Sequence, residues 1–244
     1  MNSATSPNPF SRLSFRGADP AKIHSSARGE PGYVKLLAPL ERAFYALITP
    51  VVNRLLRSGV RPNTLTTIGT LVVLASAVAY GLGWIRIGGA LLMFSGVVDT
   101  LDGQVARGSG QVTKFGAFYD STLDRVGDGA TFIGIATYFL LAPDVYWRIP
   151  AVIVSMVAVL ASLLVSYARA RAEGLGLDCK VGIAQRAERI FGLGVASVLV
   201  GAGPHALVLE IIVALLAVAS IITVVQRFVY VYQVTTLETL SKGR

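Results

Sequence analysis

The stretch Asp99–Asp124, DTLDGQVARGSGQVTKFGAFYDSTLD, places four aspartates in a region that otherwise has the composition of membrane-spanning segments. Asp99 and Asp102 are three residues apart, and Asp120 and Asp124 are four apart, so each pair shares one face of a helix. A carboxylate at membrane depth costs about 2.5 kcal/mol or more on insertion scales, and such residues are usually functional. We therefore expect a functional site here.

Four neighbouring carboxylates require positive charge among them, and a divalent cation with oxygen ligands supplies it. The short connection 108–113 predicts a hairpin of two antiparallel helices that brings the two pairs face to face. We therefore predict Asp99, Asp102, Asp120 and Asp124 as ligands of Mg²⁺ or Mn²⁺, either one ion or, as we expect, two at close spacing. On spacing alone, interhelical salt bridges or a cation-conduction path remain the alternatives.

The residues around the aspartates indicate phosphoryl chemistry. Gly103 and Gly116 have no side chains, so a substrate can approach the helix backbone there. Arg107 is expected at the rim of the site, where it could receive a phosphate. Metal-bound carboxylates can clamp a diphosphate while a spare carboxylate removes a proton from an attacking hydroxyl.

The composition is that of an integral membrane protein. The chain is 53% hydrophobic and only 15% charged, with a mean hydropathy of +0.62, which is far from a soluble domain. The net charge of +8 could suggest nucleic-acid binding, but the sequence has no known nucleic-acid-binding pattern. We assign the charge to loops over an anionic membrane leaflet and expect no nucleic-acid partner.

We predict an all-α integral membrane protein with six transmembrane helices preceded by an amphipathic interfacial helix. The expected organisation is a polar tail over residues 1–30, the interfacial helix over 31–58, the membrane domain over 59–235 and a polar C-terminal tail over 236–244. The expected spans are Asn63–Gly83, Gly88–Arg107, Lys114–Leu141, Ile149–Arg169, Gly182–Val200 and His205–Val229.

The distribution of Lys and Arg predicts the orientation in the cell (inner) membrane. If the N-terminal tail lies in the cytoplasm, Arg107, Lys114 and the basic residues of 169–189 all fall on the cytoplasmic side. The opposite side then keeps only Arg86 and Arg148. We expect both termini and the active site to face the cytoplasm.

The motif DxxDGxxAR, eight residues and then GxxxDxxxD resembles the signature of the CDP-alcohol phosphotransferases. The resemblance implies a membrane enzyme of phospholipid biosynthesis, in which an acceptor alcohol attacks the β-phosphorus of a CDP-lipid and CMP leaves. It implies that all four aspartates bind metal and that Asp124 is the general base. The signature is filled here by Asp99, Asp102, Gly103, Ala106, Arg107, Gly116, Asp120 and Asp124.

A second segment, RPNTLTT at Arg61–Thr67, is similar to the family's Pro-Asn-x-x-Thr near the nucleotide. Asn63 and Thr66 are therefore candidate cytidine or ribose contacts. Helix capping is the alternative role, since Pro and Asn before an apolar run are typical of a helix start. The residues implied to bind CDP are Asn63, Thr66, Asp99, Gly103, Arg107 and Gly116.

Three further segments resemble the inositol-phosphate branch of this family. They are DRxxDG from Asp124, SYARARAE from Ser166 and RAER from Arg186, with Gln226-Arg227 late in the last span. Arg replaces the branch's Lys at 169, and Ala replaces its Pro at 187. The resemblance implies an acceptor-phosphate site, with Arg171 and Arg186 nearby, formed by Ser166, Arg169, Arg189 and Arg227.

We therefore expect transfer of a phosphatidyl-type group from CDP-diacylglycerol, or an ether analogue, to inositol phosphate. Glycerol 3-phosphate, as used by a phosphatidylglycerophosphate synthase, is the alternative acceptor because it also needs a basic pocket. A cation transporter that uses the aspartates as ion ligands is the alternative of a different class, although internal repeats typical of transporters are absent from the sequence. Small residues on the later spans and the family resemblance favour a homodimer.

Overall fold

The computed structural model describes the backbone of residues 32–242 and the side chains of residues 44–236. The predicted tail of residues 1–30 therefore lies outside the described residues. The chain divides into two units, Met1–Thr49 and Pro50–Arg244, and helix α1 (Gly32–Arg57) begins in the first and ends in the second. Between residues 32 and 242 the regular structure is entirely helical, which confirms the predicted all-α class.

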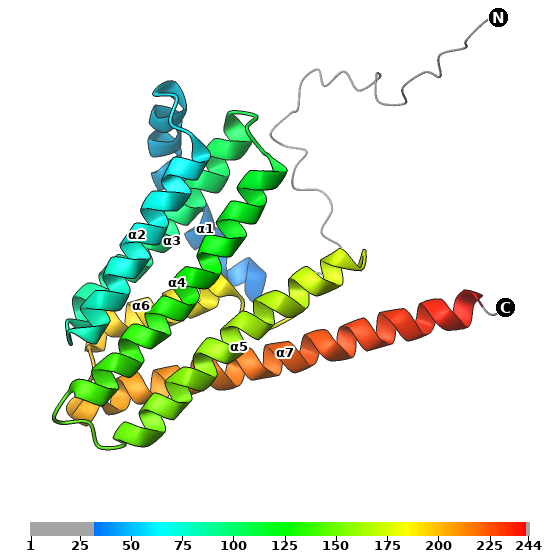
Figure 1. The fold of residues 1–244 in the computed structure, drawn as a ribbon. Helices are drawn as coiled ribbons and strands as arrows, with labels where there is room; N and C mark the ends of the chain where they lie inside the picture. The colour runs from blue at the N-terminus through cyan, green and yellow to red at the C-terminus, as the bar shows by residue number, and fades with distance from the viewer. Residues whose placement is uncertain (1–31, 243–244) are drawn as a thin grey trace, which may run out of the picture. The chain divides into compact units, whose positions relative to one another are not determined.

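The second unit contains the helices that carry the predicted site residues (Figure 1). A short 3₁₀ turn at Pro204–Ala206 precedes the last of them. The helices are α2 (Pro62–Gly81), α3 (Ile85–Gly108), α4 (Lys114–Leu141), α5 (Arg148–Gly174), α6 (Arg186–Val200) and α7 (Leu207–Lys242).

The helices of this unit pack in a connected series. Helix α2 packs on α3 and α4, α4 also packs on α5, α3 packs on α6, and α5 lies beside α7 (Figure 1). The Tyr80 hydroxyl on α2 donates a hydrogen bond to Ser197 Oγ on α6 at 2.9 Å. Large side chains with less than 2% exposure fill the space between the helices, among them Tyr80, Ile135, Phe139, Leu193, Leu209 and Val213.

Small residues allow two of these helices to approach closely. A Cβ atom at Gly134 on α4 would overlap the backbone carbonyl of Ala77 on α2. Glycine at this position therefore lets the two backbones meet, as is common between helices in membranes. This contact fixes α4, which carries Asp120 and Asp124, against α2.

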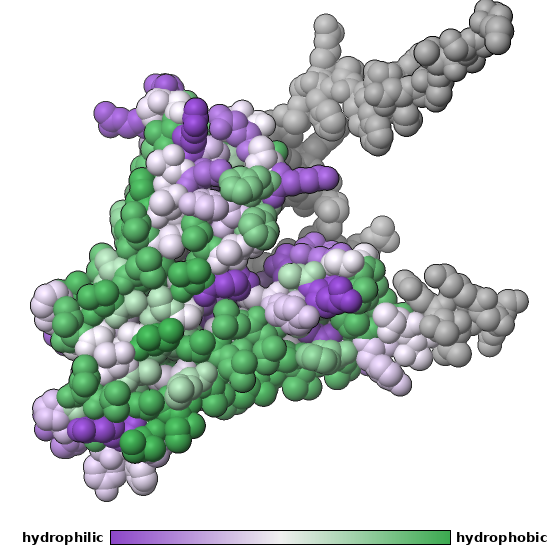
Figure 2. All heavy atoms as spheres, viewed as in Figure 1, coloured by the Kyte–Doolittle hydropathy of each residue, from purple (hydrophilic) through white to green (hydrophobic). Residues whose placement is uncertain are grey.

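Three helices of the described part are long and apolar enough to cross a membrane: Pro62–Gly81, Arg148–Gly174 and Pro204–Thr236. Helix α6 has only 15 residues, and α3 and α4 contain the aspartates, which lower their hydropathy. Figure 2 shows hydrophobic side chains over the visible faces of α5 and α7, with hydrophilic side chains gathered near the C-terminal end of α5. These features are those of a membrane protein.

Two helix boundaries differ from the sequence expectation in ways that matter for the site. Helix α5 continues to Gly174, so Arg169 lies on a helix rather than at its end. Helix α6 begins at Arg186, not Gly182, because Gln185 has an extended backbone (φ −71°, ψ 172°). Arg186 is therefore the first residue of α6.

Candidate active site

Helices α3 and α4 are consecutive and joined by the short connection 109–113, but both pack mainly on α2 rather than on each other, so the predicted face-to-face packing of the hairpin is not observed. The connection between them positions Gly116. The Thr113 side chain caps α4 by accepting a hydrogen bond from the Gly116 backbone N–H at 2.9 Å. A Cβ atom at Gly116 would lie 3.0 Å from Thr113 Oγ1 and 3.4 Å from Asn63 Oδ1. Gly116 is thus the point where the start of α4 approaches the start of α2.

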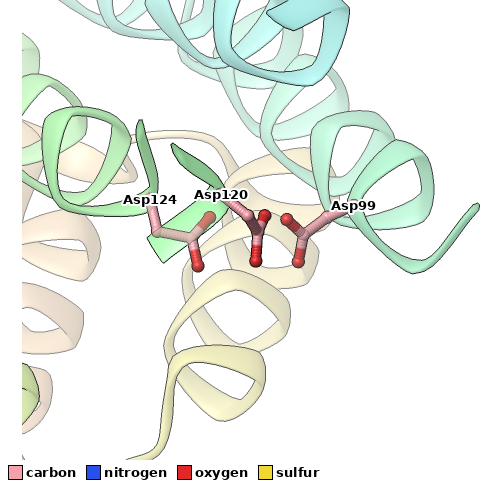
Figure 3. Close-up of side chains that lie close together, drawn as sticks. All are labelled: Asp99, Asp120 and Asp124. Atoms are coloured by element: carbon pink, nitrogen blue, oxygen red, sulfur yellow. The ribbon is translucent and has the colours of Figure 1, made fainter. Parts of the chain in front are cut away.

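Three of the four predicted metal ligands point toward one another (Figure 3). Asp99 comes from α3, whereas Asp120 and Asp124 come from α4, and one oxygen of each lies within 4.8 Å of the others. Asp120 Oδ1 is buried without a hydrogen-bond partner among the described residues. This all-oxygen set, with an unsatisfied carboxylate oxygen, fits Mg²⁺ or Mn²⁺.

Asp102 lies outside this group of three. Its side chain is buried, with 6% exposure, and its Oδ2 accepts a hydrogen bond from the Thr66 hydroxyl at 2.7 Å. Asp102 and Thr66 nevertheless line a small cavity of about 10 Å³ together with Asp99 and Asp124. The role of Asp102 as a metal ligand remains a prediction.

Two of the converging carboxylates, Asp99 and Asp124, form ion pairs with arginines from α4 and α6. Arg186 Nη1 contacts Asp99 Oδ2 at 2.7 Å, and its Nη2 contacts Asp124 Oδ1 at 2.9 Å. Arg125 Nη2 lies 3.5 Å from Asp124 Oδ2. Positive charge at these oxygens offsets the mutual repulsion of the aspartates.

Asn63 and Thr66, both implied to bind the nucleotide, line different cavities. Asn63 lines an open cavity of about 510 Å³ between the start of α2 and the connection to α4, whereas Thr66 is directed toward Asp102 instead. Arg107 is exposed, and its guanidinium lies against Gly103. A Cβ atom at Gly103 would lie 3.4 Å from this guanidinium.

The residues implied to bind the acceptor phosphate share one cavity. It measures about 330 Å³ and is also lined by Asp99, Arg125 and Arg186. Its walls come from α3, α4, α5, α6 and α7, so it brings together residues that are distant in sequence. The four predicted residues lining it are Ser166, Arg169, Arg189 and Arg227.

These four side chains differ in how firmly protein partners hold them. Arg189 contacts Asp128 at 2.6 Å, and Arg227 donates hydrogen bonds to the carbonyls of Val165 and Val181. Both arginines are buried, with 4% and 3% exposure.

The other two predicted residues, Arg169 and Ser166, are held less firmly by protein partners. Arg169 pairs with Glu173 at 2.8 Å on an exposed surface, and the Ser166 hydroxyl donates to the Ser162 carbonyl at 3.3 Å. Exposed ion pairs contribute little, so Arg169 is the arginine most readily turned toward a ligand.

Sequence reasoning missed the position of Arg186. The RAER segment marked it only as a neighbour of the acceptor site, yet its guanidinium lies among Asp99, Asp124 and Asp128. No local pattern reveals a contact between residues 87 positions apart. The position of Asp128, which meets both Arg186 and Arg189, was also not anticipated.

Comparison with known proteins identifies the family. The sequence model of the CDP-alcohol phosphatidyltransferases matches residues 60–226. Archaetidylinositol phosphate synthase of Methanothermobacter thermautotrophicus is 38% identical over 195 residues, covering 80% of this chain and 92% of the relative. Phosphatidylinositol phosphate synthase of Cutibacterium acnes is 41% identical over 194 residues, covering 76% and 92%.

Solved structures agree with this assignment. The crystal structure of Mycobacterium tuberculosis phosphatidylinositol phosphate synthase with CDP-DAG bound has a TM-score of 0.67 and 36% identity, covering 77% of this chain and 94% of that one. The same enzyme in complex with manganese and citrate also has a TM-score of 0.67 and 36% identity, covering 75% and 88%.

The chain therefore belongs to the CDP-alcohol phosphatidyltransferase family. It is a membrane transferase of phospholipid biosynthesis, and the predicted family and the predicted Mg²⁺ or Mn²⁺ cofactor are confirmed.

Proposed function

We propose that this protein transfers the phosphatidyl-type group of a CDP-lipid to an inositol phosphate and releases CMP. The observation that carries the proposal is the 330 Å³ cavity, which is lined both by Asp99 of the carboxylate group and by Arg169, Arg189 and Arg227. Guanidinium groups bind phosphate through charge-assisted hydrogen bonds. A phosphate-bearing acceptor held there would have its hydroxyl groups near the aspartates.

The names of the relatives support the two substrates. The relatives at 38% and 41% identity are an archaetidylinositol phosphate synthase and a phosphatidylinositol phosphate synthase, and the mycobacterial structure contains CDP-DAG. For the CDP-lipid of this chain, we propose Asn63, Thr66, Asp99, Gly103, Arg107 and Gly116 as binding residues.

We further propose that Asp99, Asp102, Asp120 and Asp124 hold two Mg²⁺ or Mn²⁺ ions. Divalent cations at such a site neutralise the charge of a diphosphate and of its leaving group. The cavity of about 10 Å³ shared by Asp99, Asp102 and Asp124 supports the inclusion of Asp102. Asp120 contributes the buried oxygen that has no partner among the described residues.

In this proposal Asp124 is the catalytic base. Its carboxylate takes the proton of the acceptor hydroxyl as that oxygen forms a bond to the β-phosphorus of the CDP-lipid. The bond from the β-phosphorus to the bridging oxygen breaks, and that oxygen leaves with CMP. Ser166, Arg169, Arg189 and Arg227 hold the acceptor phosphate and thereby orient its hydroxyl.

The finer membrane arrangement is also part of the proposal. We propose that α2 to α7 make six spans, that residues 31–58 lie along the membrane surface, and that residues 1–30 and 236–244 are tails. The concentration of basic residues at the site end of the helices supports a cytoplasmic active site with both termini on that side. We also propose a homodimer, supported only by small residues on the later helices.

The test is release of CMP by the purified chain in lipid nanodiscs. CDP-diacylglycerol and Mn²⁺ or Mg²⁺ are supplied with either inositol phosphate or glycerol 3-phosphate. We expect CMP release with inositol phosphate and its loss after chelation of the metal. Turnover with glycerol 3-phosphate and none with inositol phosphate would establish the other acceptor and refute this proposal.

A further inference from the structure

Arg186 is placed differently from the other arginines of the site. It begins α6, a position where the helix dipole disfavours a positive side chain, and its exposure is only 21%. Its guanidinium contacts Asp99 Oδ2 at 2.7 Å and Asp124 Oδ1 at 2.9 Å, and its Nε lies 3.5 Å from Asp128 Oδ1. One side chain thus bridges α3, α4 and α6.

Two of the three carboxylates that converge in the candidate metal site are the ones that Arg186 bridges. Asp99 and Asp124 offer oxygens within 4.8 Å of one another and of Asp120. A guanidinium at 2.7 and 2.9 Å from these groups occupies lone pairs that a cation would use. It also puts a positive charge a few ångströms from any ion bound there, and two cations at such separation repel strongly.

Arg186 also lines the cavity that holds the acceptor-phosphate candidates. Ser166, Arg169 and Arg227 line the same 330 Å³ space. A long, flexible arginine side chain could reach into this cavity without moving the start of α6. Asp128 is the most distant of its three partners, with Oδ1 at 3.5 Å from Nε.

We propose that Arg186 is an exchangeable counterion that couples the metal site to the acceptor site. Divalent cations binding to Asp99, Asp120 and Asp124 displace its guanidinium, which then turns into the cavity and binds the acceptor phosphate. The second half of this statement rests on the proposed function, whereas the competition with metal does not. By thermodynamic linkage, metal and phosphate then strengthen each other's binding by the same factor.

The competition is tested by Mn²⁺ binding to the purified full-length chain in nanodiscs, followed by the electron paramagnetic resonance signal of free Mn²⁺. We expect Arg186→Gln to bind Mn²⁺ more tightly than the wild type, by at least about fivefold, the lower end of ordinary coupling between sites. Arg125→Gln is the matched control, because among the described carboxylates Arg125 forms an ion pair with Asp124 alone, at 3.5 Å. It removes the same charge and should tighten binding less.

The coupling is tested by repeating the titration with inositol phosphate, and separately with inorganic phosphate. We expect either anion to tighten Mn²⁺ binding to the wild type, and this effect to be reduced in Arg186→Gln. Arg186→Lys keeps one charge but cannot bridge two carboxylates as a planar fork does, so its Mn²⁺ affinity should be intermediate. If Arg186→Gln does not fold, the Mn²⁺ affinity of Arg186→Lys is compared with that of the wild type instead.

Three results would overturn the proposal. Unchanged or weaker Mn²⁺ binding in both Arg186 variants would show that the arginine braces the site permanently. Equal tightening in Arg125→Gln would reduce the effect to net charge. Coupling that persists in Arg186→Gln would assign it to other residues. None of these measurements requires turnover. A wild type that releases no CMP with inositol phosphate would refute the proposed function, but the competition between Arg186 and Mn²⁺ could still be measured.

Discussion

The buried ion pair between Arg189 and Asp128 provides a quantitative prediction. Their side chains are 4% and 7% exposed, and Arg189 Nη2 lies 2.6 Å from Asp128 Oδ2. Removing Asp128 leaves the buried Arg189 without its carboxylate, and removing Arg189 leaves Asp128 with only the longer 3.5 Å contact to Arg186. Breaking a buried pair in this way costs about 3–5 kcal/mol. We therefore expect Arg189→Met and Asp128→Leu each to lower the thermal unfolding midpoint, by roughly 6–20 °C for a chain of this size.

The double variant distinguishes a specific pair from general damage to the core. Arg189→Met combined with Asp128→Leu removes both charges, so its loss of stability should be smaller than the sum of the single losses by about 2–3 kcal/mol. The measurement is thermal unfolding in detergent, followed by circular dichroism at a fixed protein concentration. Losses that add within about 0.5 kcal/mol would refute the reasoning.

Other expectations concern turnover and packing. Asp124→Asn should reduce CMP release by about 10²–10⁴-fold, the usual contribution of a general base, and undiminished turnover would exclude that role. Arg169→Gln should raise the KM for inositol phosphate by about 10- to 150-fold with little change in kcat, as expected for one charged hydrogen bond; an unchanged KM would remove Arg169 from the acceptor site. Gly134→Ala should destabilise the fold by about 1–3 kcal/mol in thermal unfolding, because its Cβ meets the Ala77 backbone, whereas Gly129→Ala, with open space around it, should not.

Local signals in the sequence predicted the bounds of α4 well. Helix α4 begins and ends at the predicted residues, Lys114 and Leu141, because Thr113 supplies a cap and Pro143 follows the end. The convergence of Asp99 with Asp120 and Asp124 was also predicted, but it depends on the packing of α3 and α4 on α2 as well as on their short connection. The bounds of α4 depend on residues next to its ends, which is why the sequence alone predicted them.

Tertiary packing decided what the sequence left open. Asp102 is three residues after Asp99 and is therefore rotated by about 60° around the helix, which is enough to direct it toward Thr66 on α2. The bridge from Arg186 to Asp99 joins α6 to α3, and its geometry depends on the packing between these helices. A charge motif identifies such residues but does not specify their partners.

The two halves of the site come from different parts of the chain. The carboxylates lie on α3 and α4, which are consecutive and joined by a short turn, whereas Arg169, Arg189 and Arg227 lie on α5, α6 and α7. Under the proposed function, the residues assigned to bond exchange can therefore stay fixed while those assigned to the acceptor alcohol diverge. A graft of residues 148–242 from a relative with another acceptor should alter product identity and retain the CDP-lipid donor, which makes this boundary a place to redesign headgroup choice.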